Sequence, residues 1–120
     1  MANEIQFNAT LIANKAGASV NKSINTTLNM TGSQMTQATQ TIGTGAWTAI
    51  SLGNLAGVPS KLLIINLDTT NFVQLATDNA GVNITDKVVA TDFVLRSPTA
   101  TIYAKANTAA VLIAITAMDA

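Results

Sequence analysis

Apolar and polar residues alternate along much of the chain, and this alternation predicts β-strands. In residues 4–13, Ile5, Phe7 and Leu11 fall on one face and mostly polar side chains on the other, as in a half-buried strand. The same two-residue period predicts strands at residues 23–31, 34–42, 47–52 and 101–105. Residues 34–42 contain few apolar side chains, which indicates an edge strand or a face that meets a partner.

The stretch at residues 61–76 combines the densest apolar run with a turn. Residues 62–65 are all leucine or isoleucine, as a strand buried on both faces requires. Asp68 and Asn71 belong to a polar segment suited to a turn, and a second apolar segment starts at Phe72. We therefore expect an antiparallel hairpin with a turn of about four residues, and we expect it to nucleate the core.

The second half of the chain continues with short apolar segments separated by turn residues. These segments are residues 82–84, 88–90, 92–96 and 110–118. The last one is apolar on both faces, which predicts burial between layers or between chains. Strands at spacings of about 8 to 12 residues are typical of a sandwich or barrel. We predict an all-β fold over residues 1–120, a single-domain antiparallel β-sandwich or barrel that is jelly-roll-like; helix is the weaker prediction throughout.

Composition narrows the function classes. The chain has no cysteine and no histidine, so disulfides, thiolate metal sites and the usual general base are absent. Charged residues make up 10% of the chain and sum to zero, whereas a typical domain has roughly 25%. We expect no enzyme, no cofactor and no nucleic-acid partner, and a weakly charged surface that associates with other subunits.

Membrane and targeting signals are also not expected. The longest apolar stretch, residues 109–118, is shorter than the roughly 20 residues that a membrane-spanning helix needs. The chain opens without a basic segment followed by an apolar one, so we expect no cleaved signal and no membrane partner.

Oxygen-rich segments offer candidate metal ligands, but the spacing does not support them. The carboxylates in question are Asp68, Asp78, Asp86 and Asp92. Residues 78–81 resemble the start of a calcium loop, yet no acidic residue follows at the position of the bidentate ligand. We therefore predict turn capping and no metal. A catalytic Ser–Lys pair stays open by composition, without any signature that supports it.

Five residues are candidates for a subunit or capsid interface. Trp47, the only tryptophan, suits a core or an interface anchor equally. Arg96, the only arginine, is either a solvated strand end or a fixed inter-strand or inter-subunit hydrogen-bond donor. Tyr103, Ile113 and Ile115 complete the predicted interface set.

Three segments resemble a group of small tailed-bacteriophage virion proteins. They are QTIGTGAWTAISLGNL at residues 40–55, LLIINLDTTNFVQLATD at 62–78 and LRSPTATIYAKANTAAVLI at 95–113. The turn at residues 66–71 and the segment 104–110 carry most of the similarity. The resemblance implies a β-structured, non-enzymatic virion component, with capsid decoration (cement) as the first assignment, and it implies no catalytic residues.

This resemblance sets the expected partners. We expect a homo-oligomer, a trimer, that binds and stabilises the capsid shell through the major capsid protein or another virion protein. The expected location is the virion, assembled in the host bacterial cytoplasm. Residues 1–35 match no feature of the group, and we expect them to take part in docking to the particle. A tail, baseplate or head-fibre component with a receptor-binding (adhesin) role is the alternative.

Overall fold

The computed structural model describes residues 5–28, 34–53, 55 and 58–118, and it divides the chain into two compact units. The first unit, Met1–Thr31, contains strands β1 (Ile5–Lys15) and β2 (Ala18–Leu28), which pair antiparallel over their full length. Ala16 and Gly17 join them with φ values of 52° and 85°. Two central residues with positive φ match the right-handed twist of a hairpin.

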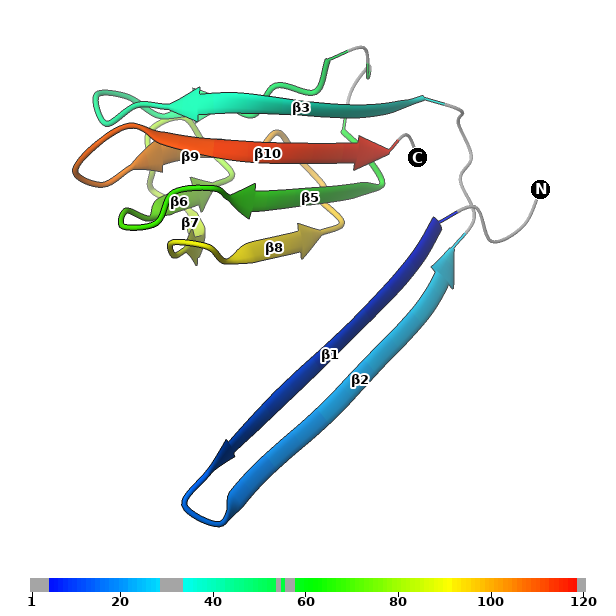
Figure 1. Ribbon diagram of the computed structural model, residues 1–120. Helices are drawn as coiled ribbons and strands as arrows, with labels where there is room; N and C mark the ends of the chain where they lie inside the picture. The colour runs from blue at the N-terminus through cyan, green and yellow to red at the C-terminus, as the bar shows by residue number, and fades with distance from the viewer. Residues whose placement is uncertain (1–4, 29–33, 54, 56–57, 119–120) are drawn as a thin grey trace. The chain divides into compact units, whose positions relative to one another are not determined.

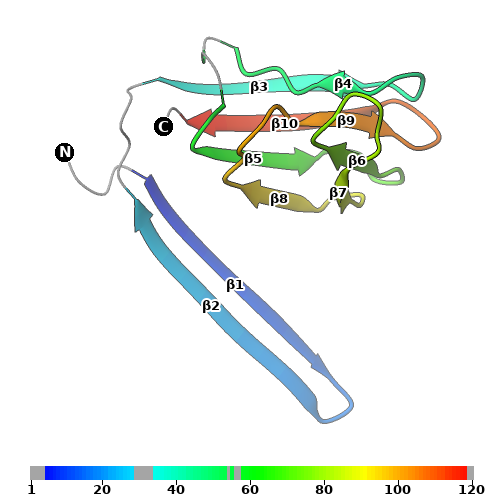
Figure 2. The same cartoon turned by 180° about the vertical axis from the view of Figure 1, so that it is seen from behind.

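The second unit, Gly32–Ala120, contains two four-stranded antiparallel sheets. Its strands are β3 (Met35–Ile42), β4 (Thr48–Ala49), β5 (Lys61–Asn66), β6 (Val73–Ala76), β7 (Ile84–Val88), β8 (Phe93–Arg96), β9 (Tyr103–Ala106) and β10 (Val111–Met118). The β10 sheet has the order β3-β10-β5-β8, and the β9 sheet has the order β4-β9-β6-β7. Figure 1 shows the β10 sheet in front, and Figure 2 shows the same molecule from behind.

The strand order is that of a jelly roll. Among the described strands of this unit, β6 and β7 are the one consecutive pair that lies side by side, and each other connection passes from one sheet to the other. Counted from β3 as the first strand, the two sheets read 1-8-3-6 and 2-7-4-5, the arrangement of a double-sheet jelly roll. The predicted all-β sandwich is confirmed.

The core lies between the two sheets, and the inner residues alternate with outer ones along each long strand. The β10 sheet contributes Ile42, Leu62, Ile64, Val111, Ile113, Ile115 and Ala117. The β9 sheet contributes Val73, Leu75, Val88, Ala104 and Ala106. Small alanines on β9 oppose large branched residues on β10, which lets the layers interdigitate.

The predicted hairpin at residues 61–76 is wrong in its pairing. Both halves form strands, but β5 pairs with β8 and β10, whereas β6 pairs with β7 and β9. Residues 67–72 therefore cross between the sheets. A strand that is apolar on both faces is most stable in the middle of a sheet with a neighbour on each side, and β5 takes that place.

The buried carboxamide of Asn66 holds this crossing. Asn66 is 1% exposed, and among the described residues it is the buried polar side chain of the unit's core. Its Nδ2 donates to the carbonyls of Asn71 at 2.9 Å and Val88 at 3.0 Å, while its Oδ1 accepts from the Asp68 amide at 2.8 Å. The polar atoms of Asn66 are thus paired, as a buried amide requires.

Other strand predictions have mixed outcomes. β3 lies at the edge of its sheet, as predicted for residues 34–42. The strand predicted at 47–52 is reduced to Thr48–Ala49. The apolar segments 82–84 and 88–90 each overlap one end of a single strand, Ile84–Val88. The second strand begins at Ala18 instead of residue 23, because residues 18–22 pair with residues 11–15. Residue 4 and residues 29–31, also predicted as strand, lie outside the described residues.

The closing strand confirms burial on one face. In β10, Val111, Ile113, Ile115 and Ala117 are buried, but Leu112 on the other face is exposed. β10 lies between β3 and β5, so its backbone is paired on both sides. The outward face of β10 is mostly apolar, and no described strand of the second unit covers it.

Asn66→Asp should destabilise the second unit far more than Asn71→Ala. The aspartate would bury a charge and would place an acceptor against the carbonyls of Asn71 and Val88, at a cost of about 3–5 kcal/mol. Asn71→Ala removes one exposed bond, from Thr108 Oγ1 at 2.6 Å, and should cost about 1 kcal/mol. Urea unfolding of both variants at neutral pH measures the difference, and equal losses would show that the crossing does not depend on Asn66.

Candidate interaction surfaces

The β1–β2 hairpin has one apolar face and one polar face. Directly paired residues of antiparallel strands share a face, and the register pairs Ala9 with Ile24 and Ala13 with Val20. The apolar face carries Phe7, Ala9, Leu11, Ala13, Val20 and Ile24, with Lys15, Lys22 and Thr26 as polar exceptions. The polar face carries Gln6, Asn8, Thr10, Asn21, Ser23, Asn25 and Thr27, with Ile12 as an apolar exception. Thr10 Oγ1 and Ser23 Oγ lie 3.3 Å apart on the polar face.

Large parts of the apolar face are open to solvent. Leu11 is 66% exposed and Ile24 is 51% exposed. β1 and β2 pair only with each other within the described chain, so the outer backbone edges of both strands are also unpaired. An isolated two-stranded hairpin is marginally stable in water. The hairpin thus offers a partner both an apolar face and strand edges that can accept a further strand.

Two predicted interface residues, Ile113 and Ile115, lie in the core. Both side chains point between the sheets and are almost completely buried. They have no exposed surface with which to contact another subunit. Their neighbour Leu112 points the other way, so the outward residues of this strand are the even-numbered ones.

Trp47 packs within its own chain. Its indole lies against Gly81, whose φ is +72°, and a side chain at Gly81 would overlap the ring. Gly81 closes the turn between β6 and β7, where its amide bonds to the Asp78 carbonyl. Trp47 stays half-buried, so part of the ring is accessible. An interface role for the accessible part stays a prediction.

Tyr103 lies on the outer face of the β9 sheet. It is half-buried and is paired with Ala49 of β4 and Ala76 of β6. Ala76 is completely buried although it also faces outward, which is consistent with cover by the tyrosine ring. The interface role predicted for Tyr103 is not tested by this placement.

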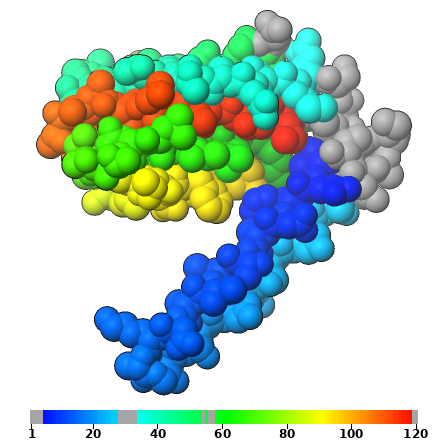
Figure 3. All heavy atoms as spheres, in the orientation of Figure 1, coloured from blue at the N-terminus to red at the C-terminus, as the bar shows by residue number. Residues whose placement is uncertain are grey.

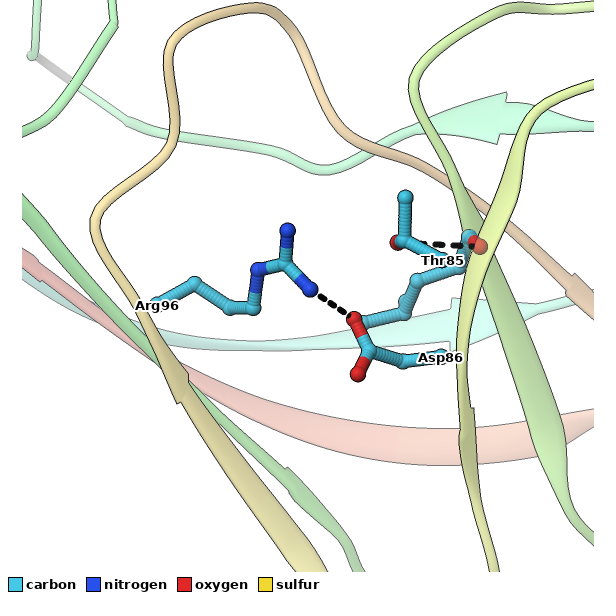
Figure 4. Close-up of polar contacts among 4 residues, drawn as sticks. Thr85, Asp86 and Arg96 are labelled. Carbon is cyan, nitrogen blue, oxygen red and sulfur yellow. Dashed lines mark hydrogen bonds and ion pairs between the residues drawn. The ribbon is translucent and has the colours of Figure 1, made fainter.

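Arg96 joins the two sheets at one edge of the sandwich. It reaches from the end of β8 to Asp86 of β7 and forms an ion pair between Arg96 Nη1 and Asp86 Oδ2 (Figure 4). Both side chains are about a third exposed or less. Next to Asp86, the Thr85 hydroxyl donates to the Leu75 carbonyl at 3.4 Å. The inter-strand role considered for Arg96 is therefore present within one chain.

Two aspartates organise turns through bonds to backbone amides. Asp68 Oδ1 accepts the amides of Thr70 and Asn71, each at 2.7 Å. Asp78 accepts the amides of Asn83 at 2.8 Å and Val82 at 3.1 Å. These backbone bonds, from Asn71 then Thr70 and from Asn83 then Val82, lower the pKa of both carboxyl groups. The described residues contain no group of three or more potential metal ligands.

One concave site among the described residues of the second unit is small. One pocket, lined by Ile50, Leu62, Pro98 and Ile102 among others, has a volume of about 20 Å³, which is roughly the space of one water molecule. Ligand sites for small molecules are usually about 300–1,000 Å³. No helix in the described part of the chain is long and apolar enough to cross a membrane.

The predicted interface residues do not form one cluster, and two apolar surfaces were missed. Arg96 lies at one edge of the sandwich, and the two isoleucines are internal. The missed surfaces are the apolar face of the hairpin and the outer face of the β10 sheet. The alternation at residues 5–13 and the two-sided apolar runs at 62–65 and 111–118 were the signals for them.

Comparisons with known proteins add no assignment. The chain matches no protein-family model, and no curated protein matches it significantly.

Gly81→Ala should destabilise the second unit and change the emission of the single tryptophan. The new methyl group meets the Trp47 indole at a backbone conformation with positive φ, and such strain costs about 1–3 kcal/mol. Gly45→Ala is the matched control because nothing lies within 4 Å of its added Cβ; it should change stability by no more than about 0.5 kcal/mol. Unfolding followed by Trp47 fluorescence compares the two, and similar curves would contradict the contact.

Asp68 and Asp78 should make stability fall in acid. Because their pKa values are lowered in the folded state, they stabilise the fold above the unfolded pKa of about 3.9. This stabilisation disappears as the pH falls from that value through the lowered pKa values. The double variant Asp68→Asn/Asp78→Asn should be less stable than the wild type at neutral pH and should lose less stability on acidification. Urea midpoints between neutral pH and pH about 2.5 test this, and unchanged pH dependence would contradict it.

Proposed function

We propose that this protein is a non-enzymatic structural component of a tailed-phage virion, a capsid decoration (cement) protein that works as a homo-oligomer. The observation that carries the proposal is the amphipathic β1–β2 hairpin, which forms a compact unit of its own and leaves its apolar face and both backbone edges open. A segment with these properties is suited to attach the jelly roll to a larger structure.

The docking chemistry follows from the composition of the hairpin. Within residues 5–28 the charged side chains are Lys15 and Lys22. Attraction over long distances therefore contributes little, and binding depends on short-range apolar contact and strand pairing. The partner that fits is a protein surface with an apolar groove or a free strand edge, and in this proposal it is the major capsid protein or another virion protein.

Two further observations agree with this proposal. The sequence segments that resemble small phage virion proteins include the corner at residues 66–71, which here joins the two sheets. The jelly roll itself occurs in viral capsid domains and also in lectin domains. Fold alone does not determine function, so the hairpin carries more weight than the fold.

A receptor-binding component of the tail, baseplate or head fibre is the second candidate, because jelly rolls also occur in lectins. Such a component needs a surface that recognises a glycan or a receptor. Copy number per virion, measured by quantitative mass spectrometry, separates the two candidates. Hundreds of copies would support decoration of the shell, and a few copies would support the second candidate.

Ile24→Asp should abolish most of the binding to the particle. It places a carboxylate on the apolar face of the hairpin, and burying it against a partner should weaken binding at least about tenfold, or 1.4 kcal/mol. Asn25→Asp is the matched control because it adds the same charge at the next residue on the polar face. Co-sedimentation of each purified variant with shells that lack the protein measures retention. The proposal would be contradicted if both variants bound as the wild type does, or if the wild type itself were not retained.

A further inference from the structure

The outer face of the β10 sheet is apolar where a solvated sheet is usually polar. Direct pairing places β3, β10, β5 and β8 side by side and puts their outward residues on one surface. The outward residues of β10, β5 and β8 include Leu63, Ile65, Phe93, Leu95, Leu112 and Met118, together with the smaller Ala114 and Thr116. An antiparallel sheet with one face in water normally alternates apolar inward and polar outward. β5 and β10 depart from that pattern on adjacent central strands.

The second unit leaves this surface uncovered. Phe93 is 52% exposed and Leu112 is 43% exposed, and Met35 at the β3 edge is also exposed. Figure 3 shows β3, β10, β5 and β8 as adjacent bands, with no other strand of the second unit lying over them. Aromatic residues and methionine are enriched in the centres of protein interfaces.

The charge on the surface limits the kinds of partner. Lys61, at the start of β5, is the charged residue among the outward residues of the four strands, and its Nζ bonds to Ser97 Oγ. The remaining outward residues are apolar, apart from threonine and glutamine on β3 and Thr116 on β10. A strongly charged partner would find almost no opposite charges on this surface with which to pair. A second copy of the chain presents the same uncharged, apolar surface.

The area of the surface also fits a pair of copies. Strands of 8, 8, 6 and 4 residues form the sheet. At about 4.8 Å between strands and 3.3 Å per residue, these give a flat area of about 400 Å² per copy. Two such faces hide about 800 Å² in total, an area that corresponds to a weak, reversible interface.

We propose that the outer face of the β10 sheet binds the same face of a second copy, so that two jelly rolls stack sheet against sheet. Sheets pack face to face at about 10 Å with their strands nearly aligned. A face that meets itself has twofold symmetry, and each apolar residue is then used twice. This inference rests on the proposal that the protein works as an oligomer, and it makes the smallest assembly a dimer instead of the trimer expected from the resemblance.

Leu112→Lys and Phe93→Lys test the contact on two different strands. Each adds a charge at an exposed position of the surface, so folding should be retained. Val82→Lys is the matched control, since Val82 is an exposed valine in the turn between β6 and β7. Sedimentation equilibrium from about 1 to 100 µM should show the wild type passing from one chain to two, and both surface variants should associate at least about tenfold more weakly. Circular dichroism confirms that each variant is folded.

Three results would overturn the proposal. They are a wild type that stays monomeric throughout, a stable mass of three chains, or a loss of association in Val82→Lys equal to that in Leu112→Lys. Ile24→Asp separates this inference from particle docking, because it should lose retention on shells and keep the dimer. If instead the wild type is monomeric but Leu112→Lys loses retention on shells, the surface binds another virion protein and not a second copy.

Discussion

The buried carboxamide of Asn66 is the constraint on which the jelly roll depends. Asn66 ends β5 in one sheet, yet its Nδ2 bonds to the carbonyl of Val88 at the end of β7 in the other. The same group bonds to Asn71 across the connecting segment, and Oδ1 orients the Asp68 amide. Without this side chain, two carbonyls at the junction would lack their partner, so one residue determines where the chain leaves the first sheet.

Sequence patterns predicted which segments form strands better than they predicted which strands pair with each other. The alternation in residues 4–13 and 34–42 and the apolar run at 110–118 are local patterns and were sufficient to identify strands. Pairing is not local, because Ile64 of β5 lies opposite Ile115 of β10, far away along the chain. The segment 61–76 looked like a hairpin because its two strands are adjacent in sequence. The preference of Asn66 for a buried, fully bonded place has no signature in the sequence.

The same reasoning explains why interface residues were misassigned in β10. A strand that is apolar on both faces gives no indication of which face points inward. Ile113 and Ile115 belong to the predicted interface set, but they fill the core, and Leu112 faces outward. For Arg96 the sequence left a solvated strand end and a fixed hydrogen-bonding role open, and the ion pair with Asp86 corresponds to the inter-strand role.

The low charge of the chain and its two apolar surfaces, one on each unit, have a common consequence for binding. With 10% charged residues and no net charge, the protein has little electrostatic steering and little for salt to screen. Each surface must therefore act by short-range contact, and neither is large enough for tight binding alone. Both surfaces belong to one chain, so the first contact raises the effective concentration of the second surface at its partner. The two contacts together therefore bind more tightly than either alone. In the proposed decoration of a shell, weak contacts repeated over many copies hold the shell firmly while each subunit remains exchangeable.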